Sequence, residues 1–263
     1  MKIIVCVKQV PLTGDVALHS EKYTLLRQSA LGMLNPYDKE ALETALALRE
    51  KHGGQVYALS MGPEQAREIL RECLAMGADA AVLLSDPCFS GSDTLATSYI
   101  LAAGVRKLGG SNLILCGQCA LDGNTAQVGP ELAAQLDFVQ ITRGINIDIE
   151  GDILTVQRKA ENGLEWLTAS LPALVTISQA PQSPRSPTVK GAIRARNQEI
   201  TAWNAADLAV SQNSTGISGS PTRVRRITTP FIDTTVPCQL ITEQTPEQSA
   251  RVLIGKLREN RIL

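Results

Sequence analysis

The sequence is poor in aromatic residues and in histidine. Its 263 residues include three phenylalanines, four tyrosines, two tryptophans and two histidines. His19 and His52 lie far apart, and neither has a cysteine or carboxylate at metal-ligand spacing, which argues against a zinc site and a histidine-based catalytic triad. Aromatic side chains are almost absent near the basic positions, so the chain lacks the stacking platform that single-stranded nucleic acids require.

Charge of one sign and long apolar runs are also missing. The formal net charge of −1 gives no electrostatic reason to expect nucleic acid or an anionic membrane as a partner. No apolar run approaches the length that spans a bilayer, and residues 2–7 lack the layout of a signal peptide. The six cysteines are too scattered for a disulfide framework. We therefore expect a cytoplasmic protein with no membrane span and no nucleic-acid partner.

Short apolar runs alternate with helical patterns through the first half of the chain. Strands are predicted at 3–7, 56–59, 80–84 and 113–116, and helices at 38–51, 64–76, 94–108 and roughly 130–136. This alternation predicts a parallel sheet with right-handed crossovers. Ligands of such sheets bind beyond the carboxyl ends of the strands. The loops 8–14, 60–63, 85–93 and 117–129 are therefore expected to converge on one crevice.

The segment 113–130 is the most informative part of the chain. An apolar strand stops at Gly117, a polar loop follows, and a helix begins with Pro130 in its first turn. Such a junction directs backbone N–H groups and a helix N-terminus at one point, a geometry that binds phosphate. The same pattern also serves as plain turn and capping chemistry in α/β proteins. We predict a nucleotide site here.

Individual residue types suggest roles within this site. Gly123 and Gly129 permit close backbone approach, and Thr125 with the amides after it can hold phosphate. Asp122 can fix the loop or accept a hydrogen bond from a ribose hydroxyl. Asp93 either contacts the ligand or only caps the helix that follows it. Cys116 and Cys119 have dithiol spacing, but Cys116 ends an apolar strand and is better interpreted as a buried structural cysteine.

The pattern changes after residue 138. Residues 145–149 alternate between apolar and polar, 150–152 form a turn signal, and 153–158 and 166–169 continue as strands, which predicts a β-hairpin region. Prolines at 181, 184 and 187 predict an exposed, extended loop. The Ser- and Gly-rich stretch 211–220 predicts a flexible linker, and 246–258 a terminal amphipathic helix. The tail reaches another subunit or forms a loosely packed surface arm.

Several segments together resemble a known family. They are 7–11 (VKQVP), 35–38 (NPYD) with 41–43 (ALE), 75–79 (AMGAD), 93–98 (DTLATS) and the loop 122–130. In this order they are similar to the β subunit of electron-transfer flavoproteins. The later segment 184–196 (PRSPTVKGAIRAR) resembles the partner-recognition loop of that family.

The resemblance implies an α/β fold with a Rossmann-like parallel sheet, helices on both faces, and adenine-nucleotide binding, extended by the β-hairpin region and a C-terminal arm. Residues 1–200 would form the nucleotide-binding domain, with the partner-recognition loop at 181–197. Residues 201–263 would form a linker and an arm whose terminal helix packs on the α subunit. The family forms heterodimers in which the α subunit carries a redox FAD, and the β subunit holds either AMP or a second FAD.

The loop 122–130 (DGNTAQVGP) is similar to the DGDTAQVGP of members that bifurcate electrons, with Asn124 in place of Asp. Leu12 also stands where those members usually have Asp. On this comparison the β site holds FAD reduced by NADH, and electrons pass to a dehydrogenase or another redox partner, with ferredoxin or flavodoxin as candidates. The chain would then be an electron-carrier subunit with NADH-dependent flavin reduction. The alternative is a non-redox AMP- or ATP-binding module of the same fold.

The candidate site residues follow from the loops and the resemblance. The expected cofactor-binding residues are Lys8, Gln9, Val10, Asn35, Ser60, Gly62, Asp93, Thr94, Thr97, Cys116, Gly117, Asp122, Gly123, Asn124, Thr125, Ala126, Gln127, Val128 and Gly129. The expected partner-docking residues are Pro187, Val189, Lys190, Ile193 and Arg194. No catalytic residue and no metal ligand is expected.

The recognition loop departs from the family pattern at three positions. Ser183 replaces an acidic residue, Ser186 replaces tyrosine, and Val189 replaces the anchoring leucine. Valine buries roughly one methylene less than leucine, worth about 0.8 kcal/mol. We expect an acceptor other than an ordinary short-chain acyl-CoA dehydrogenase.

Overall fold

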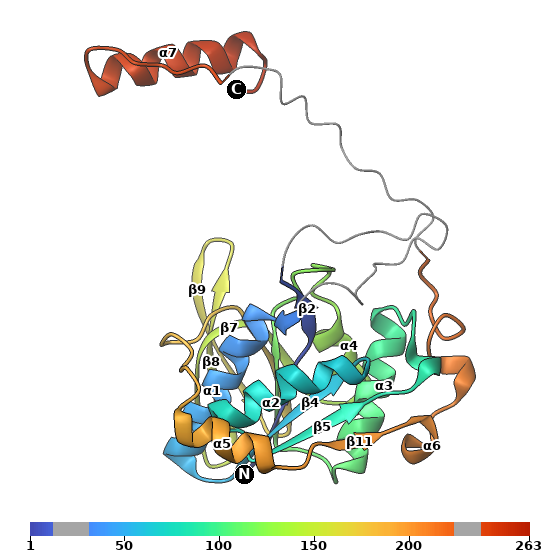
Figure 1. The fold of residues 1–263 in the computed structure, drawn as a ribbon. Helices are drawn as coiled ribbons and strands as arrows, with labels where there is room; N and C mark the ends of the chain where they lie inside the picture. The colour runs from blue at the N-terminus through green and yellow to red at the C-terminus, as the bar shows by residue number, and fades with distance from the viewer. Residues whose placement is uncertain (13–31, 224–237) are drawn as a thin grey trace. The chain divides into compact units, whose positions relative to one another are not determined.

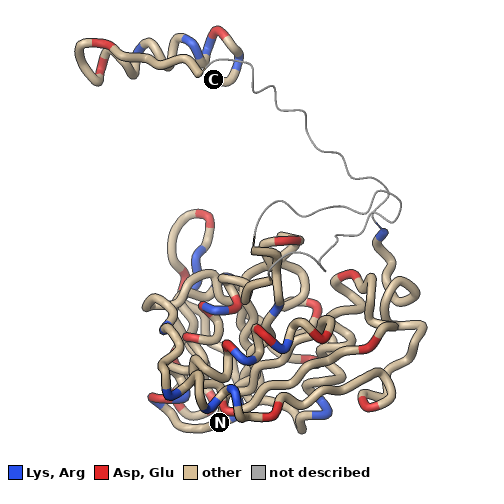
Figure 2. Tube along the Cα trace, in the orientation of Figure 1, with Lys and Arg blue, Asp and Glu red and all other residues tan. Residues whose placement is uncertain are grey.

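The computed structural model describes residues 1–12, 32–223 and 238–263 (Figure 1). The chain forms two compact units, Met1–Arg225 and Arg226–Leu263. Within the first unit, acidic and basic residues are interspersed along the trace (Figure 2). This mixture fits the net charge close to zero.

Among the described residues, the first unit is built on a nine-stranded sheet with the order β11-β5-β4-β1-β6-β10-β7-β8-β9. Its strands are β1 (Lys2–Cys6), β4 (Gln55–Met61), β5 (Ala80–Leu84), β6 (Leu113–Gly117), β7 (Val139–Glu150), β8 (Ile153–Ala160), β9 (Gly163–Ser170), β10 (Ala173–Ile177) and β11 (Thr201–Trp203). The strands from β11 to β7 run parallel, and β7, β8 and β9 form an antiparallel meander. The predicted parallel strands and hairpin region are confirmed.

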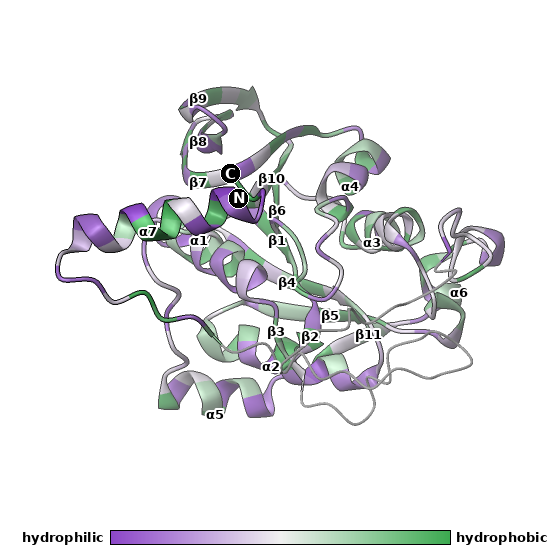
Figure 3. Ribbon diagram, turned by 90° about the horizontal axis from the view of Figure 1, so that it is seen from above, coloured by the Kyte–Doolittle hydropathy of each residue, from purple (hydrophilic) through white to green (hydrophobic). Residues whose placement is uncertain are grey.

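Helices cover both faces of the sheet, as predicted (Figure 3). They are α1 (Pro36–His52), α2 (Arg67–Met76), which follows the 3-10 turn η1 (Glu64–Ala66), α3 (Thr94–Lys107) and α4 (Val128–Leu136). Strand alternation divides the core between the two faces. Ile3 and Val5 pack in one cluster with the apolar residues of α1 and α2. Ile4 and Ile114 pack in the other with those of α3 and α4.

Several smaller elements were not predicted from the sequence. The strands β2 (Gln9–Pro11) and β3 (Gly32–Leu34) form a separate antiparallel pair. The helix α5 (Val189–Asn197) forms inside the expected recognition loop and packs against α2. The short helix α6 (Ala205–Leu208) packs against α3, and η2 (Pro87–Phe89) and η3 (Gln212–Ser214) are single 3-10 turns. No helix of the described residues is long and apolar enough to cross a membrane.

The prediction of a flexible linker at 211–220 is wrong. This stretch contains η3 and folds against the loop that precedes α3. The Ser220 hydroxyl donates to the Gly216 carbonyl at 2.6 Å and accepts from the Asp93 amide at 2.8 Å, while the Gly216 amide donates to the Ser92 hydroxyl at 3.0 Å. The small polar residues that suggested flexibility instead make side-chain-to-backbone hydrogen bonds in tight turns. The first unit accordingly continues past residue 200, where β11 joins the sheet beside β5.

The second unit contains the predicted terminal helix, α7 (Pro246–Glu259). It begins with a capping box, in which the Thr245 hydroxyl accepts from the Gln248 amide and the Gln248 side chain accepts from the Thr245 amide. Proline occupies the first turn, where its missing N–H costs nothing. None of the helix residues is buried, and Val252, Leu253 and Ile254 are exposed apolar side chains.

Candidate nucleotide-binding site

The loops that follow β1, β4, β5 and β6 start at the same edge of the sheet. The strand register pairs Cys6 with Leu59 and with Cys116, and Met61 with Leu84. Because the four strands are parallel, their carboxyl ends meet at this edge, where ligands of such sheets bind. The described part of the first loop, residues 7–12, therefore lies at the same end of the sheet as the loops after β4, β5 and β6.

Two side chains at the start of α1 join the first and last of these loops. Asp38 accepts from the backbone N–H of Lys8 at 2.8 Å and of Gly117 at 3.1 Å. Asn35 donates through Nδ2 to the Cys119 carbonyl at 2.8 Å and accepts from the Leu121 amide at 3.3 Å. Both side chains are buried. Asn35 was predicted as a site residue, whereas Asp38 was not.

Asp38 carries its carboxyl group into the interior of the protein. Burial raises the pKa of this carboxyl to about 7, against the opposing effect of hydrogen bonds from Asn35, Lys8 and Gly117. A buried carboxyl that accepts from a backbone amide of each of two loops holds those loops together. We therefore regard Asp38 as a loop-organising residue.

An ion pair adds a further link between the loops. The Lys8 ammonium lies 2.7 Å from Asp122 Oδ1, and the Asp122 side chain is only 5% exposed. Of the two roles predicted for Asp122, this contact supports fixing of the loop. The partial exposure of Lys8, 40% of its side chain, leaves the ammonium accessible from solvent.

The loop after β6 has the backbone form expected of an anion site. Asn124 and Ala126 adopt positive φ values of 50° and 55°, a conformation that side-chain-bearing residues rarely take. No described residue accepts a hydrogen bond from the backbone N–H of Thr125, Ala126 or Gln127. Alternation of left-handed residues with their neighbours turns successive N–H groups toward a common concavity, and the N-terminus of α4 follows directly.

Gly129 lies where α4 meets the sheet. This residue is buried, and a side chain there would run into Thr176 on β10. The glycine therefore allows α4 to approach the sheet closely. Gly123, in contrast, is exposed, and no atom lies within 4 Å of the position that a Cβ would occupy.

The start of α3 lies beside the same loop. Thr94 Oγ1 donates to Glu131 Oε1 of α4 at 3.0 Å and lies 3.5 Å from Gln127 Oε1. Asp93 caps α3 by accepting from the Ala96 amide, and its second oxygen accepts from Thr222. Although burial raises the pKa of Asp93, these hydrogen bonds hold it below the usual value. The capping interpretation of Asp93 is confirmed.

Glu131 is a site residue that the sequence did not single out. Burial raises the pKa of its carboxyl, and the nearby charge of Asp93 adds to this effect. Its Oε2 atom is buried and has no hydrogen-bond partner among the described residues. The only sequence signal was a carboxylate in the first turn of α4, a position usually explained by the helix dipole.

The remaining predicted residues lie in or beside β4, α3 and β2. Ser60 is fully buried at the end of β4, with no partner for its hydroxyl among the described residues, and the Gly62 amide donates to the Leu84 carbonyl. Thr97 is partly buried one turn into α3, and Gln9 is partly buried in β2. Val10 is 1% exposed, so its side chain is buried.

Cys116 is buried, as its position on a strand predicted. It packs beside Cys6 of β1, and the contact with Cys6 together with burial raises the pKa of the Cys116 thiol. Only its backbone remains available to a ligand. Among the described residues, no group of three or more His, Cys, Asp or Glu side chains could hold a metal ion. His52 pairs with Asp148, and His19 lies outside the described residues.

The predicted docking residues lie on α5 or shortly before it. Val189 is 81% and Ile193 61% exposed, and both stand on the same side of the helix because they are four residues apart. Lys190 is exposed beside them, and Pro187 precedes the helix. The Arg194 guanidinium donates to the Leu74 carbonyl of α2 at 2.9 Å, so it also fastens α5 to the body of the protein.

Comparison with known proteins agrees with this geometry. The family model described as electron transfer flavoprotein domain matches residues 23–208. The chain belongs to this family. The electron transfer flavoprotein subunit beta of Megasphaera elsdenii is 46% identical over 237 residues, with 88% of both chains covered.

Two further relatives carry more specific names. The caffeyl-CoA reductase-Etf complex subunit CarD of Acetobacterium woodii is 42% identical over 268 residues, with both chains covered completely. Protein FixA of Azorhizobium caulinodans is 43% identical over 238 residues, covering 88% of this chain and 85% of the relative. The resemblance found in the sequence to electron-transfer flavoprotein β subunits is therefore confirmed.

Proposed function

We propose that this chain is the β subunit of a heterodimeric electron-transfer flavoprotein and that the crevice at the strand ends binds FAD. The observation that carries the proposal is the loop after β6, whose positive-φ residues precede α4. Asp38 and the Lys8–Asp122 ion pair hold this loop to the residues that follow β1. This arrangement has the chemistry of a pyrophosphate site. AMP in the same place is the alternative ligand.

The residues present fit an adenine nucleotide. Backbone amides of residues 125–128 and the N-terminus of α4 would hold phosphate oxygens, while the Lys8 ammonium would face their negative charge. Ser60, whose buried hydroxyl has no partner in the described part of the chain, would supply a hydrogen-bonding group at the end of β4. A bound flavin would take a hydride from NADH and release electrons singly, and the chain's own residues would orient it and set its electrostatic surroundings.

The match of 125–130 to bifurcating members favours FAD over AMP. On this proposal FAD in the β site would supply electrons to two acceptors, a dehydrogenase reached through the α-subunit flavin, and ferredoxin or flavodoxin. The name of the CarD relative, which refers to a complex with caffeyl-CoA reductase, supports a CoA-ester reductase or dehydrogenase as the partner. All six cysteines are free, which supports the cytoplasm as the location.

The docking surface belongs to the same proposal. Pro187, Val189 and Ile193 would enter an apolar pocket on the acceptor, with Lys190 and Arg194 at its margin. Because Val189 is smaller than the leucine usual in the family, the preferred acceptor would differ from an ordinary short-chain acyl-CoA dehydrogenase. Efficient electron transfer to such a generic dehydrogenase would refute this part.

The test is the nucleotide content of the heterodimer purified after co-expression with the product of the neighbouring gene. We expect flavin absorption bands and release of two FAD per heterodimer on denaturation. One FAD and one AMP would reject bifurcation and place AMP in this crevice. A colourless chain that binds AMP or ATP without any partner subunit would instead establish a non-redox nucleotide-binding module.

A further inference from the structure

The proline-rich segment between β10 and α5 is fastened to one helix. Residues 178–188 contain no helix or strand, yet several of their polar groups bind carboxylates of α1. The Ala180 amide donates to Glu40 at 2.8 Å, and Gln182 donates to Glu43 at 3.3 Å. Three prolines stiffen this segment, so a few contacts determine its path.

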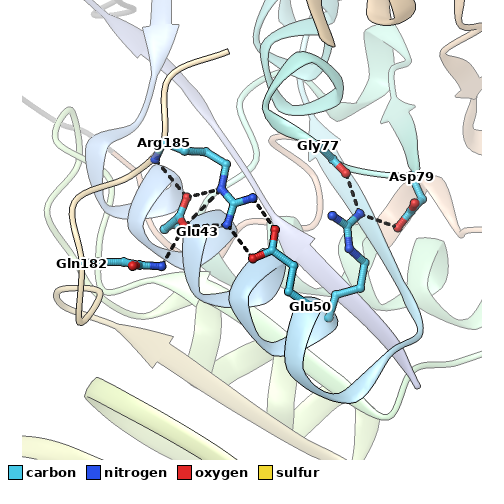
Figure 4. A network of polar contacts seen from close by, with 7 residues as sticks. Glu43, Glu50, Gly77, Asp79, Gln182 and Arg185 are labelled. Carbon is cyan, nitrogen blue, oxygen red and sulfur yellow. Dashed lines mark hydrogen bonds and ion pairs between the residues drawn. The ribbon is translucent and has the colours of Figure 1, made fainter. Parts of the chain in front are cut away.

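Arg185 makes the strongest of these contacts (Figure 4). Its Nε and Nη2 atoms donate to the two Glu43 oxygens, each at 2.9 Å, and its own backbone N–H donates to Glu43 Oε2 at 2.9 Å. Nη1 and Nη2 also donate to Glu50, which lies about two turns beyond Glu43 on α1. A carboxylate that holds both the backbone and the side chain of one residue fixes the position of the chain there.

The burial of Glu43 makes this contact energetically important. Its side chain is 2% exposed, so loss of Arg185 would leave an uncompensated buried carboxylate. Burial raises the pKa of Glu43, but the hydrogen bonds from Arg185 outweigh this and leave it below its usual value. Arg185 is therefore held by ionised partners across the neutral pH range.

The other end of α5 is held separately. Arg71 of α2 donates to the Ala195 and Arg196 carbonyls, and Gln198 donates to the Asp79 carbonyl. Gly191 lies against the Ala75 carbonyl, where no side chain would fit. These contacts secure the helix along α2, but they lie beyond Val189. The path of the chain that leads to Val189 is set by Arg185, four residues earlier.

We propose that Arg185, clamped by Glu43 and Glu50 of α1, is a positioning residue that presets Pro187 and Val189 for docking to the electron acceptor. This inference rests on the proposed docking function and names the device that orients it. A segment already held in its docking path loses less conformational freedom on binding. The acceptor suited to the exposed surface has an apolar pocket with acidic groups near Lys190.

The test uses the complete heterodimer with its bound nucleotides and the variants Arg185→Gln, Arg185→Lys and Glu50→Gln. The acceptor is whichever of several purified acyl-CoA dehydrogenases and caffeyl-CoA reductase the unaltered heterodimer reduces fastest. For Arg185→Gln we expect the KM for the acceptor to rise about tenfold with kcat little changed. Arg185→Lys should restore part of the loss, because it keeps the charge but not the planar fork. Glu50→Gln removes, at a half-exposed position, one of the two carboxylates that hold Arg185, so it should fold even if Arg185→Gln does not.

Two controls separate positioning from general damage. Arg49→Gln removes a neighbouring arginine of α1 that binds Gly77 and Asp79 and not the proline-rich segment, so it should leave the acceptor KM unchanged. Reduction of the small dye dichlorophenolindophenol needs no docking and should be equal in all variants. The backbone amide of residue 185 should exchange its hydrogen faster in Arg185→Gln than in the unaltered protein.

The outcomes are distinguishable. Faster exchange together with an unchanged acceptor KM would overturn the positioning role while leaving the proposed function intact. An equal rise of KM in Arg49→Gln would also overturn it. Failure of the unaltered heterodimer to reduce any acceptor would overturn the proposed function itself, and the positioning role with it.

Discussion

At the scale of single residues, Asp38 couples the candidate site to pH. Its carboxyl has a pKa of about 7 in the folded chain, compared with an ordinary value of 3.8. Between these values the folded state keeps a proton that the unfolded state has released, so the free energy of unfolding falls as pH rises through this range. Stability from this group is thus greatest in acid and lowest above neutrality.

Asp38→Asn should remove this dependence. We expect the variant to lose some stability at about pH 5, because its amide can accept from only one of the two backbone N–H groups, and to change by a smaller amount at about pH 8. Urea unfolding at both pH values measures the effect. Asp152→Asn, at an exposed turn, is the control. Parallel pH profiles for Asp38→Asn and the unaltered protein would contradict the assignment.

Gly123→Val tests the phosphate loop. The glycine is exposed and has open space around it, so the fold should survive, while the branched side chain should occupy the volume of the phosphates and abolish nucleotide retention. Nucleotide released per folded heterodimer is the measurement. Ala134→Val adds bulk at an exposed position of α4 and should retain the nucleotide. Normal cofactor content in folded Gly123→Val would sink the assignment of this loop.

At the scale of elements, α5 should act as the docking element independently of the crevice. Val189→Asp places a charge on an exposed apolar position, which an apolar pocket on the acceptor would reject. We expect at least a tenfold loss of electron transfer to the acceptor, with NADH reduction of the bound flavin unchanged. Stopped-flow absorption follows both steps. Unimpaired transfer would mean that another element docks.

Periodicity explains which elements could be predicted. The strands β1, β4, β5 and β6 are short apolar runs buried on both faces, a pattern that depends only on neighbouring residues. The helix α5 was missed because it contains a glycine and few apolar residues and follows three prolines. It is stabilised by Arg71 and Arg194 through carbonyl groups distant in sequence. The folded stretch 211–220 was missed because Ser and Gly suit tight turns as well as linkers.

Part of the candidate site could also be predicted from the sequence. The strand-end loops follow from the order of elements. Lys8 and Asp122 do join two of these loops, and Thr94 joins α3 to α4. Asp38 and Glu131 were missed, because their partners are 30 to 79 residues away or on another helix. Long-range partners of this kind leave no local pattern. Val10 and Gly129, which were also assigned to the ligand, are buried.

At the scale of the whole molecule, the second unit should contribute to subunit association. Helix α7 exposes Val252, Leu253 and Ile254, and exposed apolar side chains of this kind are stabilised when a partner covers them. We expect Leu253→Glu to weaken association with the α subunit by about tenfold or more, with nucleotide binding in Met1–Arg225 unaffected. Analytical ultracentrifugation compares it with Arg251→Gln, another exposed position. Equal association constants would leave α7 as a surface arm.

The position of β10 has a consequence for the order in which the protein is made. This strand lies between β6 and β7, although it follows both in the chain. The meander β7–β8–β9 therefore cannot join the sheet until residues 173–177 have left the ribosome, and α4 lacks the surface against which Gly129 packs until then. A nascent chain that already contains the whole phosphate loop is still without the support that shapes it. Synthesis must run well past the proposed phosphate loop before that loop gains its support, and such distant pairings make folding slow.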